Sequence, residues 1–230
     1  MPNHVSHRII ITGDAKQMKD FLSSCFTTKK DGKYFDFEKI IPMPEIVKKS
    51  ESSSDTSLGY EAITGKPFPC KYFQSSVLDY PWVKEKGIKT TSELKAHLEK
   101  HNPQALVVGQ ASIDAIKETG SANWYDWSNE HWNTKWNAYD CNIIEMGNLG
   151  LELIFDTAWS SPEPIFNKLA ERFDKLNFEG SAYDEGGGFA VNIDYKEGSG
   201  ETVFVDATIA HRCFVYGESL EDWMPWEDAA

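Results

Sequence analysis

The sequence predicts an α+β fold, with a ferredoxin-like antiparallel sheet and an inserted helical subdomain. Segments with the composition and alternation of strands lie at the start of the chain and within residues 141–230. Between them, residues 70–122 are mostly helical in pattern. The predicted order is strand, helix, helical insertion, two strands, helix and strand, followed by a terminal hairpin. This order resembles a split βαβ sheet.

The N-terminal part, residues 1–47, is predicted to supply one strand and one helix of the sheet domain. Residues 5–13 (VSHRIIITG) alternate and are rich in β-branched side chains, which predicts a strand. Asp14 can cap a helix over residues 14–26, in which apolar side chains recur at helical spacing. Residues 34–47 are expected to begin as a short extended segment, and Pro42 and Pro44 are expected to keep the residues after them extended and to stop any helix.

The middle part, residues 48–140, is predicted to be a flexible excursion followed by the helical insertion and a tryptophan-rich block. Residues 48–69 are polar, with Ser and Gly throughout, which favours a mobile segment. One helix is expected to stop before Pro103. A second begins near that proline and ends at Gly120, the asymmetry typical of helix ends.

The last part, residues 141–230, is predicted to complete the sheet. Residues 141–159 read as two strands around Gly147-Asn148, and residues 161–176 as a capped amphipathic helix. Three further strands, joined by glycine-containing turns, are predicted at 176–183, 188–195 and 201–207.

The formal net charge is −13, and its distribution along the chain is uneven. Residues 151–230 carry 17 acidic and 5 basic residues, a balance of −12, whereas residues 1–150 carry 19 and 18. Such an acidic region repels nucleic-acid phosphates, so direct nucleic-acid binding is disfavoured, and it attracts a basic protein partner. The alternative is a solvated face that keeps the protein soluble.

The C-terminal segment, residues 218–230 (ESLEDWMPWEDAA), alternates acidic with large apolar side chains. Aromatic anchors with a charged rim are typical of binding hot spots, whereas the structural alternative is that both tryptophans cover the domain. We predict a partner-binding set from this tail and the acidic face: Asp184, Glu185, Glu218, Glu221, Asp222, Trp223, Trp226, Glu227 and Asp228.

Four of the eight tryptophans form a block: Trp124, Trp127, Trp132 and Trp136. Helical phase separates the first two from the last two, so they cannot share one exposed stripe of a continuous helix. Acidic residues outnumber the one lysine of the block, which argues against a stacking platform for bases. We therefore favour a structural aromatic knot whose indole N–H groups bond to nearby polar side chains.

Other groups of side chains give weaker evidence of a metal site or an active site, and we predict no catalytic residue, metal or cofactor. His97 and His101 have the i, i+4 spacing of a metal pair, but no third ligand is marked. A small-molecule or nucleotide enzyme with a pocket between the sheet and the helical insertion is the alternative. Its acid–base candidates are His131, Asp140, Asp156 and Asp184.

The cysteines and the apolar runs bear on the cellular compartment. The four cysteines are far apart in sequence, which favours free thiols in a reducing cytosol. The apolar run at the N-terminus is too short for a signal peptide, and no stretch approaches the roughly 20 apolar residues of a membrane helix. We expect a cytoplasmic protein.

Several stretches resemble the Api-like proteins of phages and conjugative plasmids: NHVSHRIIITGD at the start, FDFEKIIPMPE at 35–45, the NWYDW…HWNTKWNAYD block, and residues 155–190. The resemblance implies a ferredoxin-like C-terminal domain in a mobile-element protein that acts inside a bacterial cell. Because this family has no assigned activity, the resemblance transfers no catalytic residue.

Charge and resemblance together predict a non-enzymatic interaction protein. It would bind and inhibit a basic host nucleic-acid-handling or defence complex through its acidic C-terminal third, as an anti-CRISPR protein does. Besides the enzyme, a further alternative is single-stranded nucleic-acid binding through the tryptophan block and the basic pairs Lys29-Lys30 and Lys48-Lys49.

Overall fold

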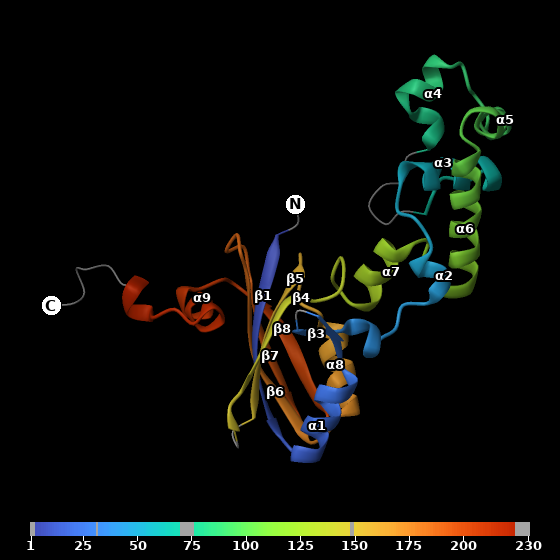
Figure 1. The fold of residues 1–230 in the computed structure, drawn as a ribbon. Coiled ribbons are helices and arrows are strands. Elements are labelled where there is room, and N and C mark those ends of the chain that lie inside the picture. The colour runs from blue at the N-terminus through green and yellow to red at the C-terminus, as the bar shows by residue number, and fades with distance from the viewer. Residues whose placement is uncertain (1–2, 31, 70–75, 148–149, 224–230) are drawn as a thin grey trace. The chain divides into compact units, whose positions relative to one another are not determined.

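The computed structural model describes residues 3–30, 32–69, 76–147 and 150–223, with only the backbone at 222 and 223 (Figure 1). The chain divides into two compact units. One contains residues 1–42 and 128–230, and the other contains residues 43–127. We call them the sheet unit and the helical unit.

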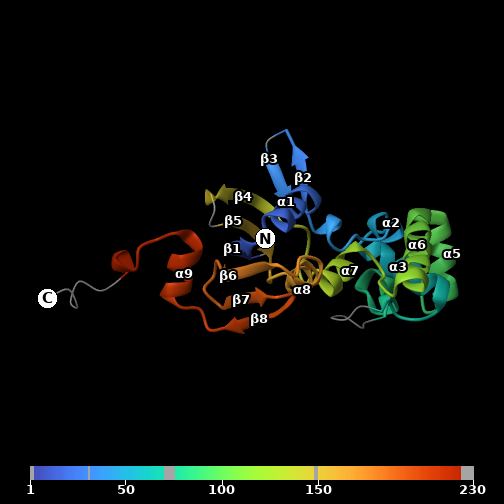
Figure 2. The ribbon, with the colours of Figure 1, turned by 90° about the horizontal axis from the view of Figure 1, so that it is seen from below.

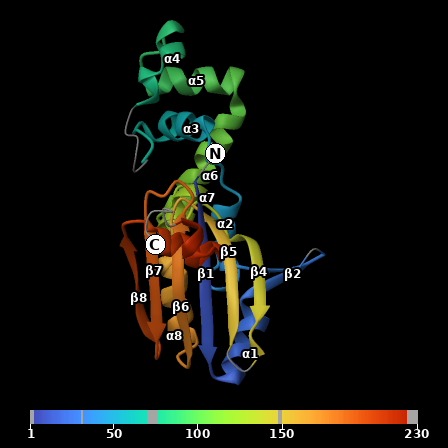
Figure 3. The same ribbon diagram turned by 90° about the vertical axis from the view of Figure 1, so that its left-hand side faces the viewer.

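The sheet unit is built on six antiparallel strands in the order β4-β5-β1-β6-β7-β8 (Figure 3). Their bounds are β1 His4–Gly13, β4 Tyr139–Glu145, β5 Leu151–Ala158, β6 Leu176–Asp184, β7 Ala190–Lys196 and β8 Ser199–Val205. Helix α1 (Ala15–Ser24) follows β1, and helix α8 (Glu163–Arg172) follows β5. The order β4-β5-β1-β6 with these two helices is ferredoxin-like topology, and β7 and β8 extend it as a hairpin. The predicted fold class is confirmed.

The two faces of the sheet differ in what covers them. Helices α1 and α8 lie on one side, which we call the inner face, and helix α9 (Ile209–Tyr216) lies on the other, the outer face (Figures 1 and 2). Alternate residues of β1 point inward and are fully buried, namely Val5, His7, Ile9 and Ile11. The alternation in the sequence of β1 therefore marks its core side correctly.

An aromatic core fills the space between the inner face and its helices. Phe21 of α1 lies at its centre, with its ring 5.3–6.3 Å from those of Phe26, Phe35, Phe173 and Phe178. Helix α1 begins where the sequence predicts, because the carboxylate of Asp14 accepts a hydrogen bond from the backbone N–H of Gln17 at 2.9 Å.

A short hairpin of β2 (Phe26–Lys29) and β3 (Gly32–Phe35) was not predicted beyond an extended start at residue 34. Each strand has only four residues, too few for alternation to stand out. The 3₁₀ turn η1 (Phe37–Lys39) follows.

The helical unit contains α2 (Glu45–Lys48), α3 (Ser54–Thr64), η2 (Val77–Asp79), α4 (Pro81–Glu85), α5 (Thr91–His101), α6 (Pro103–Thr119) and the start of α7 (Trp124–His131). As predicted, helix α5 ends just before Pro103, and helix α6 begins at this proline. Its core includes Leu58, Ala62, Val77, Val83, Leu94 and Leu98.

The expectation of a mobile excursion over residues 48–69 is wrong for its central part, which forms α3. Ser53 caps the helix, and Gly65 ends it in the left-handed region at φ 71°. Gly59 lies against the backbone of α6 so closely that a Cβ atom on it would meet the Ala105 carbonyl oxygen at 1.8 Å and the Gly109 Cα at 3.1 Å. The serine and glycine content reflects helix ends and close helix packing, which composition alone does not distinguish from a flexible loop.

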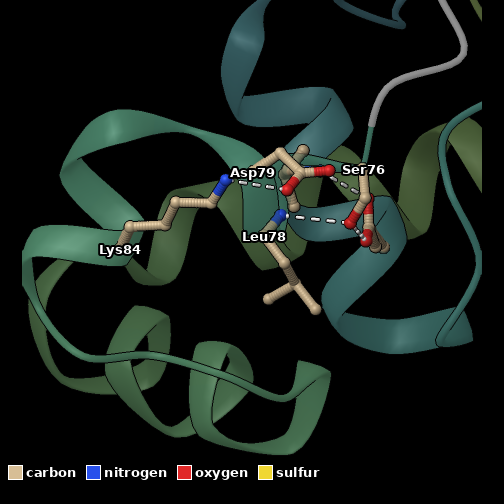
Figure 4. A network of polar contacts seen from close by, with 6 residues as sticks. Ser76, Leu78, Asp79 and Lys84 are labelled. Carbon is tan, nitrogen blue, oxygen red and sulfur yellow. Dashed lines mark hydrogen bonds and ion pairs between the residues drawn. The ribbon is translucent and has the colours of Figure 1, made fainter.

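A buried carboxylate organises the segment after α3. Glu61 is 2 % exposed and accepts hydrogen bonds from the Ser76 hydroxyl and, at 2.8 Å, from the backbone N–H of Val77. The Ser76 hydroxyl accepts in turn from the N–H of Leu78 at 3.2 Å, and Lys84 pairs with Asp79 at 2.9 Å (Figure 4). Local capping therefore holds η2 and α4 in place.

The boundary between the units falls inside the tryptophan block, at residues 127 and 128, whereas the sequence suggested an insertion over 48–140. Residues beyond the boundary are bonded within the sheet unit. The Ser128 hydroxyl donates to the Lys135 carbonyl at 2.7 Å, and the Asn133 amide donates to the Ser161 carbonyl at 2.9 Å. None of the helices in the described part of the chain combines the length and hydropathy required to cross a bilayer.

Candidate partner-binding face

The outer face of the sheet carries acidic side chains in register. The strand pairing sets Glu179 of β6 opposite Asp194 of β7, and sets Asp194 opposite Glu201 of β8. Directly opposed residues point to the same face of a sheet, so these three carboxylates form one line across three strands. We call Glu179, Asp194 and Glu201 the acidic row. Like charges directly opposite each other destabilise a sheet, so the fold itself does not benefit from this row.

One cation partly neutralises the acidic row. Lys196 Nζ lies 3.1 Å from Asp194 Oδ1 and 3.4 Å from Glu179 Oε2, and its hydrogen bond to Asp194 is the main reason that its pKa is raised. Glu201 has no cationic partner within the described ranges. All three carboxylates are exposed. The row therefore keeps a net negative charge in contact with solvent.

An open groove of about 580 Å³ lies beside the row, between the outer face and α9. Its apolar lining comes from Ile10, Ala210 and Phe214, and its polar lining includes Glu179 and His211. Ile10 pairs directly with Glu179 across β1 and β6, so the groove adjoins the row without a gap. An apolar floor with an acidic rim suits a ligand that is itself both apolar and basic.

Arg8 of β1 holds α9 over this groove. Its guanidinium pairs with Glu152 of β5, donates from Nη1 to the Phe214 carbonyl at 2.8 Å, and lies 5.6 Å from the centre of the Phe214 ring. A cation at the last turn of a helix also interacts favourably with the helix dipole. At the other end, His211 Nε2 lies 3.2 Å from the Asn192 side-chain oxygen on β7. Helix α9 is thus tied to β1 and β7 on either side of the groove.

Of the partner-binding residues predicted from the sequence, some are exposed and one, Asp184, is buried. Asp184 is 3 % exposed, and its carboxylate accepts from the Asn3 amide at 3.2 Å and the Gly188 N–H at 3.1 Å. This corrects the expectation that Asp184 lies on an acidic surface, because the glycine turn folds back onto it. Glu185 is exposed, and its carboxylate accepts from the His4 N–H at 2.9 Å.

The predicted C-terminal tail is described only at its start. Glu218 accepts two hydrogen bonds of 3.1 Å from Arg212, and Glu221 is exposed in η4 (Leu220–Trp223). The side chains of Asp222 and Trp223, and all of Trp226, Glu227 and Asp228, lie outside the described residues. The role of the two tryptophans therefore stays a prediction.

The acid–base candidates fall into different surroundings. Asp156 and Asp140 lie near Tyr139, whose hydroxyl is 2.7 Å from His4 Nδ1. Burial, with the charges of these two carboxylates, raises the pKa of Tyr139, and burial also raises the pKa of Asp156. Asp184 is instead engaged by Asn3 and Gly188, and His131 ends α7.

The tryptophan block divides between core and surface. Trp127 and Trp132 are each 3 % exposed, and Trp132 Nε1 donates to the Ile41 carbonyl at 2.9 Å. Trp124 is half-buried. Trp136 is 37 % exposed, and Lys135 Nζ lies between its ring, at 4.8 Å, and that of Trp159, at 4.7 Å. Trp127 and Trp132 are thus buried within their own units, whereas Trp136 contributes to a surface stack, and the structural knot stays a prediction.

Sequence reasoning missed a buried serine–histidine pair. His7 Nε2 lies 3.1 Å from Ser161 Oγ, and both residues are fully buried. The His7 ring stacks on Phe155 at 4.5 Å, and burial lowers the His7 pKa to about 3, so the imidazole is neutral at physiological pH. This pair has the contact of a nucleophile and its base but no access for a substrate, so its role is structural. The inward position of His7 in the β1 alternation is the signal that could have located it.

Metal-binding side chains do not converge in the described residues. The His97 and His101 rings are 4.5 Å apart on α5, but no group of three or more His, Cys, Asp or Glu side chains there is arranged to hold a metal. Cys25, Cys141 and Cys213 are free thiols, and Cys70 lies outside the described residues.

Comparison with known proteins supports the ferredoxin-like part. Residues 131–222 match the family model for the ferredoxin-like domain in Api92-like protein. The crystal structure of the protein Api92 from Yersinia pseudotuberculosis is similar over 90 % of this chain and 99 % of that chain, at 13 % sequence identity and a TM-score of 0.43. A search of curated proteins found no match.

Proposed function

We propose that this chain is a non-enzymatic interaction protein of a phage or plasmid that acts in the bacterial cytoplasm. It binds and inhibits a basic host nucleic-acid-handling or defence complex, in the manner of an anti-CRISPR protein. The observation that carries the proposal is the acidic row, Glu179, Asp194 and Glu201, exposed beside an apolar groove on the outer face.

The acidic row suits a surface that normally binds nucleic acid. Its carboxylates follow one another at the strand spacing of about 4.8 Å, which forms a negative stripe. Such a stripe competes with phosphates for the same Lys and Arg side chains of a partner. Binding there would block the partner from its nucleic acid, so inhibition requires no catalytic step.

The groove offers the apolar contacts that the acidic row does not provide. Electrostatic attraction mainly accelerates association and is weakened by salt, whereas buried apolar anchors contribute most of the affinity. Phe214 and Ile209 of α9 are 40 % and 49 % exposed, and each can cover apolar side chains of the partner. The proposed partner therefore has a basic surface with apolar residues among its Lys and Arg side chains.

Affinity purification from a bacterial host tests the proposal. The wild-type chain is compared with a row variant, Glu179→Gln, Asp194→Asn and Glu201→Gln, and with a matched control, Glu51→Gln, Glu85→Gln and Glu99→Gln. The control changes the net charge equally at exposed positions of the helical unit.

We expect wild type and control to retain the same basic nucleic-acid-binding protein, and the row variant to lose it. Retention should also fall steeply as salt rises. Recovery of no basic partner by the wild type, or equal loss in both variants, would contradict the proposal.

A further inference from the structure

The two edges of the six-stranded sheet are protected to very different degrees. At the β4 edge the pairing register shifts between Tyr139 and Asn142, Asp140 has a left-handed backbone at φ 50°, and β3 packs beside the strand. Irregular backbone and a covering segment are devices that stop an edge strand from pairing with another chain. The β4 edge is thus less accessible to a further strand, most of all near Tyr139–Asn142.

The β8 edge has few of these devices. Strand β8 forms the margin of the sheet (Figure 3) and reads SGETVFV, without proline or lysine and with Glu201 as its one charged residue. Val203 is 39 % and Phe204 is 46 % exposed, one on each face of the strand. A regular, partly apolar edge of seven residues is a template for strand addition.

The register shows which backbone N–H and C=O groups of β8 are not hydrogen-bonded to β7. Strands β7 and β8 are joined by a two-residue turn, Glu197-Gly198, with φ values of 51° and 81°. The closing pair of such a turn exchanges both hydrogen bonds, and paired and unpaired positions then alternate along the strands. Starting from Lys196 and Ser199, the N–H and C=O groups of Gly200, Thr202 and Phe204 point away from β7. Within the described ranges, these groups form no backbone hydrogen bond.

We propose that β8 binds an extended, basic segment of a partner protein as an added seventh strand. This inference rests on the proposed function and names how the partner is held. The added strand satisfies the backbone groups of Gly200, Thr202 and Phe204 and places alternate side chains on the outer face next to Glu201. Its basic side chains there extend toward the acidic row.

Charge selects a basic partner over a second copy of this chain. The exposed residues beside β8 include Asp194, Glu197, Glu201 and Asp206, and Lys196 is the one cation of β7 and β8. Two copies joined edge to edge would bring these carboxylates together, and like charges opposed across strands are destabilising. A segment with Lys or Arg at alternate positions pairs with them instead.

The experiment uses the full chain and a synthetic peptide in which lysine alternates with valine. A second peptide, in which glutamate replaces lysine, controls for charge. Affinity is measured by fluorescence anisotropy, and the amides of β8 are followed by hydrogen exchange. We expect the lysine peptide alone to bind and to slow exchange at Gly200, Thr202 and Phe204.

A matched pair of variants tests whether the outward backbone N–H of Thr202 in β8 contributes to peptide binding. Thr202→Pro removes an N–H that points outward, so the ladder with β7 keeps its bonds. Thr202→Val also loses the hydroxyl, which lies 3.0 Å from the Tyr195 hydroxyl, but keeps the N–H. We expect Thr202→Pro to weaken peptide binding about tenfold or more, and Thr202→Val to leave it nearly unchanged.

Several results would overturn the inference. They are binding without protection of the β8 amides, equal affinity of the two Thr202 variants, or a wild-type dimer that Thr202→Pro dissociates. The host purification separates this failure from that of the proposed function. If Thr202→Pro still retains the basic host partner while the row variant loses it, the edge inference fails and the acidic-face proposal stands.

Discussion

The inner and outer faces of the same sheet carry different kinds of side chains. The inner face buries aromatic rings against α1 and α8, whereas the outer face holds three opposed carboxylates, an open groove and a single helix tied down by Arg8. Burial of apolar surface stabilises the fold, and opposed carboxylates do not. The contrast teaches that the buried rings of the inner face stabilise the sheet whereas the acidic row does not, and variants on the two faces should therefore behave differently.

The largest effect is expected at the centre of the inner face. Phe21→Ala removes a fully buried ring that contacts four other phenylalanines, so we expect a loss of about 3–5 kcal/mol in the free energy of unfolding. Denaturant unfolding measures it. Val203→Ala on the outer face, at a residue 39 % exposed, is the control and should cost under about 1 kcal/mol. Equal losses would remove the distinction between the faces.

The next effect is a pH dependence that originates on the inner face. Burial lowers the pKa of His7 to about 3 in the folded chain from its ordinary value of 6.5, so between these pH values the unfolded chain binds a proton that the folded chain does not. Above pH 6.5 protonation of His7 therefore does not reduce the free energy of unfolding. As the pH drops from 6.5 toward 3, the free energy of unfolding falls by up to about 1.4 kcal/mol per pH unit.

Urea unfolding of wild type and His7→Gln across this pH range measures the dependence. The variant lowers stability at neutral pH but should lack the His7 contribution to the slope. Parallel slopes in both proteins would show that other groups cause the acid sensitivity.

A smaller effect is expected where α9 joins the outer face. Arg8→Gln leaves Glu152, whose side chain is 7 % exposed, without its ion-pair partner, and removes the bond to the Phe214 carbonyl. We expect a loss of about 1–3 kcal/mol, together with faster hydrogen exchange in α9. Arg212→Gln breaks the half-buried pair with Glu218, which is more open to solvent than Glu152, and should change stability by under about 1 kcal/mol. Unchanged exchange in α9 after Arg8→Gln would show that other contacts hold this helix.

The smallest effect, and one of opposite sign, is expected in the acidic row. Neutralising Glu201 by Glu201→Gln removes a like-charge contact with Asp194, so we expect stability to rise by about 0.2–1 kcal/mol at low salt. The gain should shrink as salt screens the charges. Thermal unfolding at two salt concentrations measures it. A clear loss of stability would mean that the row contributes to folding after all.

Local sequence signals predicted most of the sheet unit. The alternation in residues 5–13, the Asp14 cap and the glycine turn between β6 and β7 each depend on neighbouring residues, and each was correct. Of the glycines expected between β7 and β8, Gly198 lies in the turn, but Gly200 lies within β8. The hairpin β2–β3 and helices α2, α3 and α9 were missed. Strands of four residues are too short for periodicity, and Gly59 reads as flexible unless its packing partner Gly109 is known.

The candidate site was predicted only in part, because proximity across strands cannot be read along the chain. The sequence indicated an acidic C-terminal third but pointed to Asp184, which the fold buries, and passed over Glu179, Asp194 and Glu201. Each member of the acidic row looks like an ordinary exposed carboxylate in its own segment. Only the register of β6, β7 and β8 reveals that they are neighbours.

What the sequence by itself determined about this protein is its fold class, its uneven charge and the identity of its main helices and strands. These follow from periodicity, capping and composition, which act over a few residues. The tertiary structure decided which carboxylates gather, which tryptophans are buried and which sheet edge stays open. Those properties depend on strand register and packing between distant segments, and a shift of one residue in register would move every side chain to the other face.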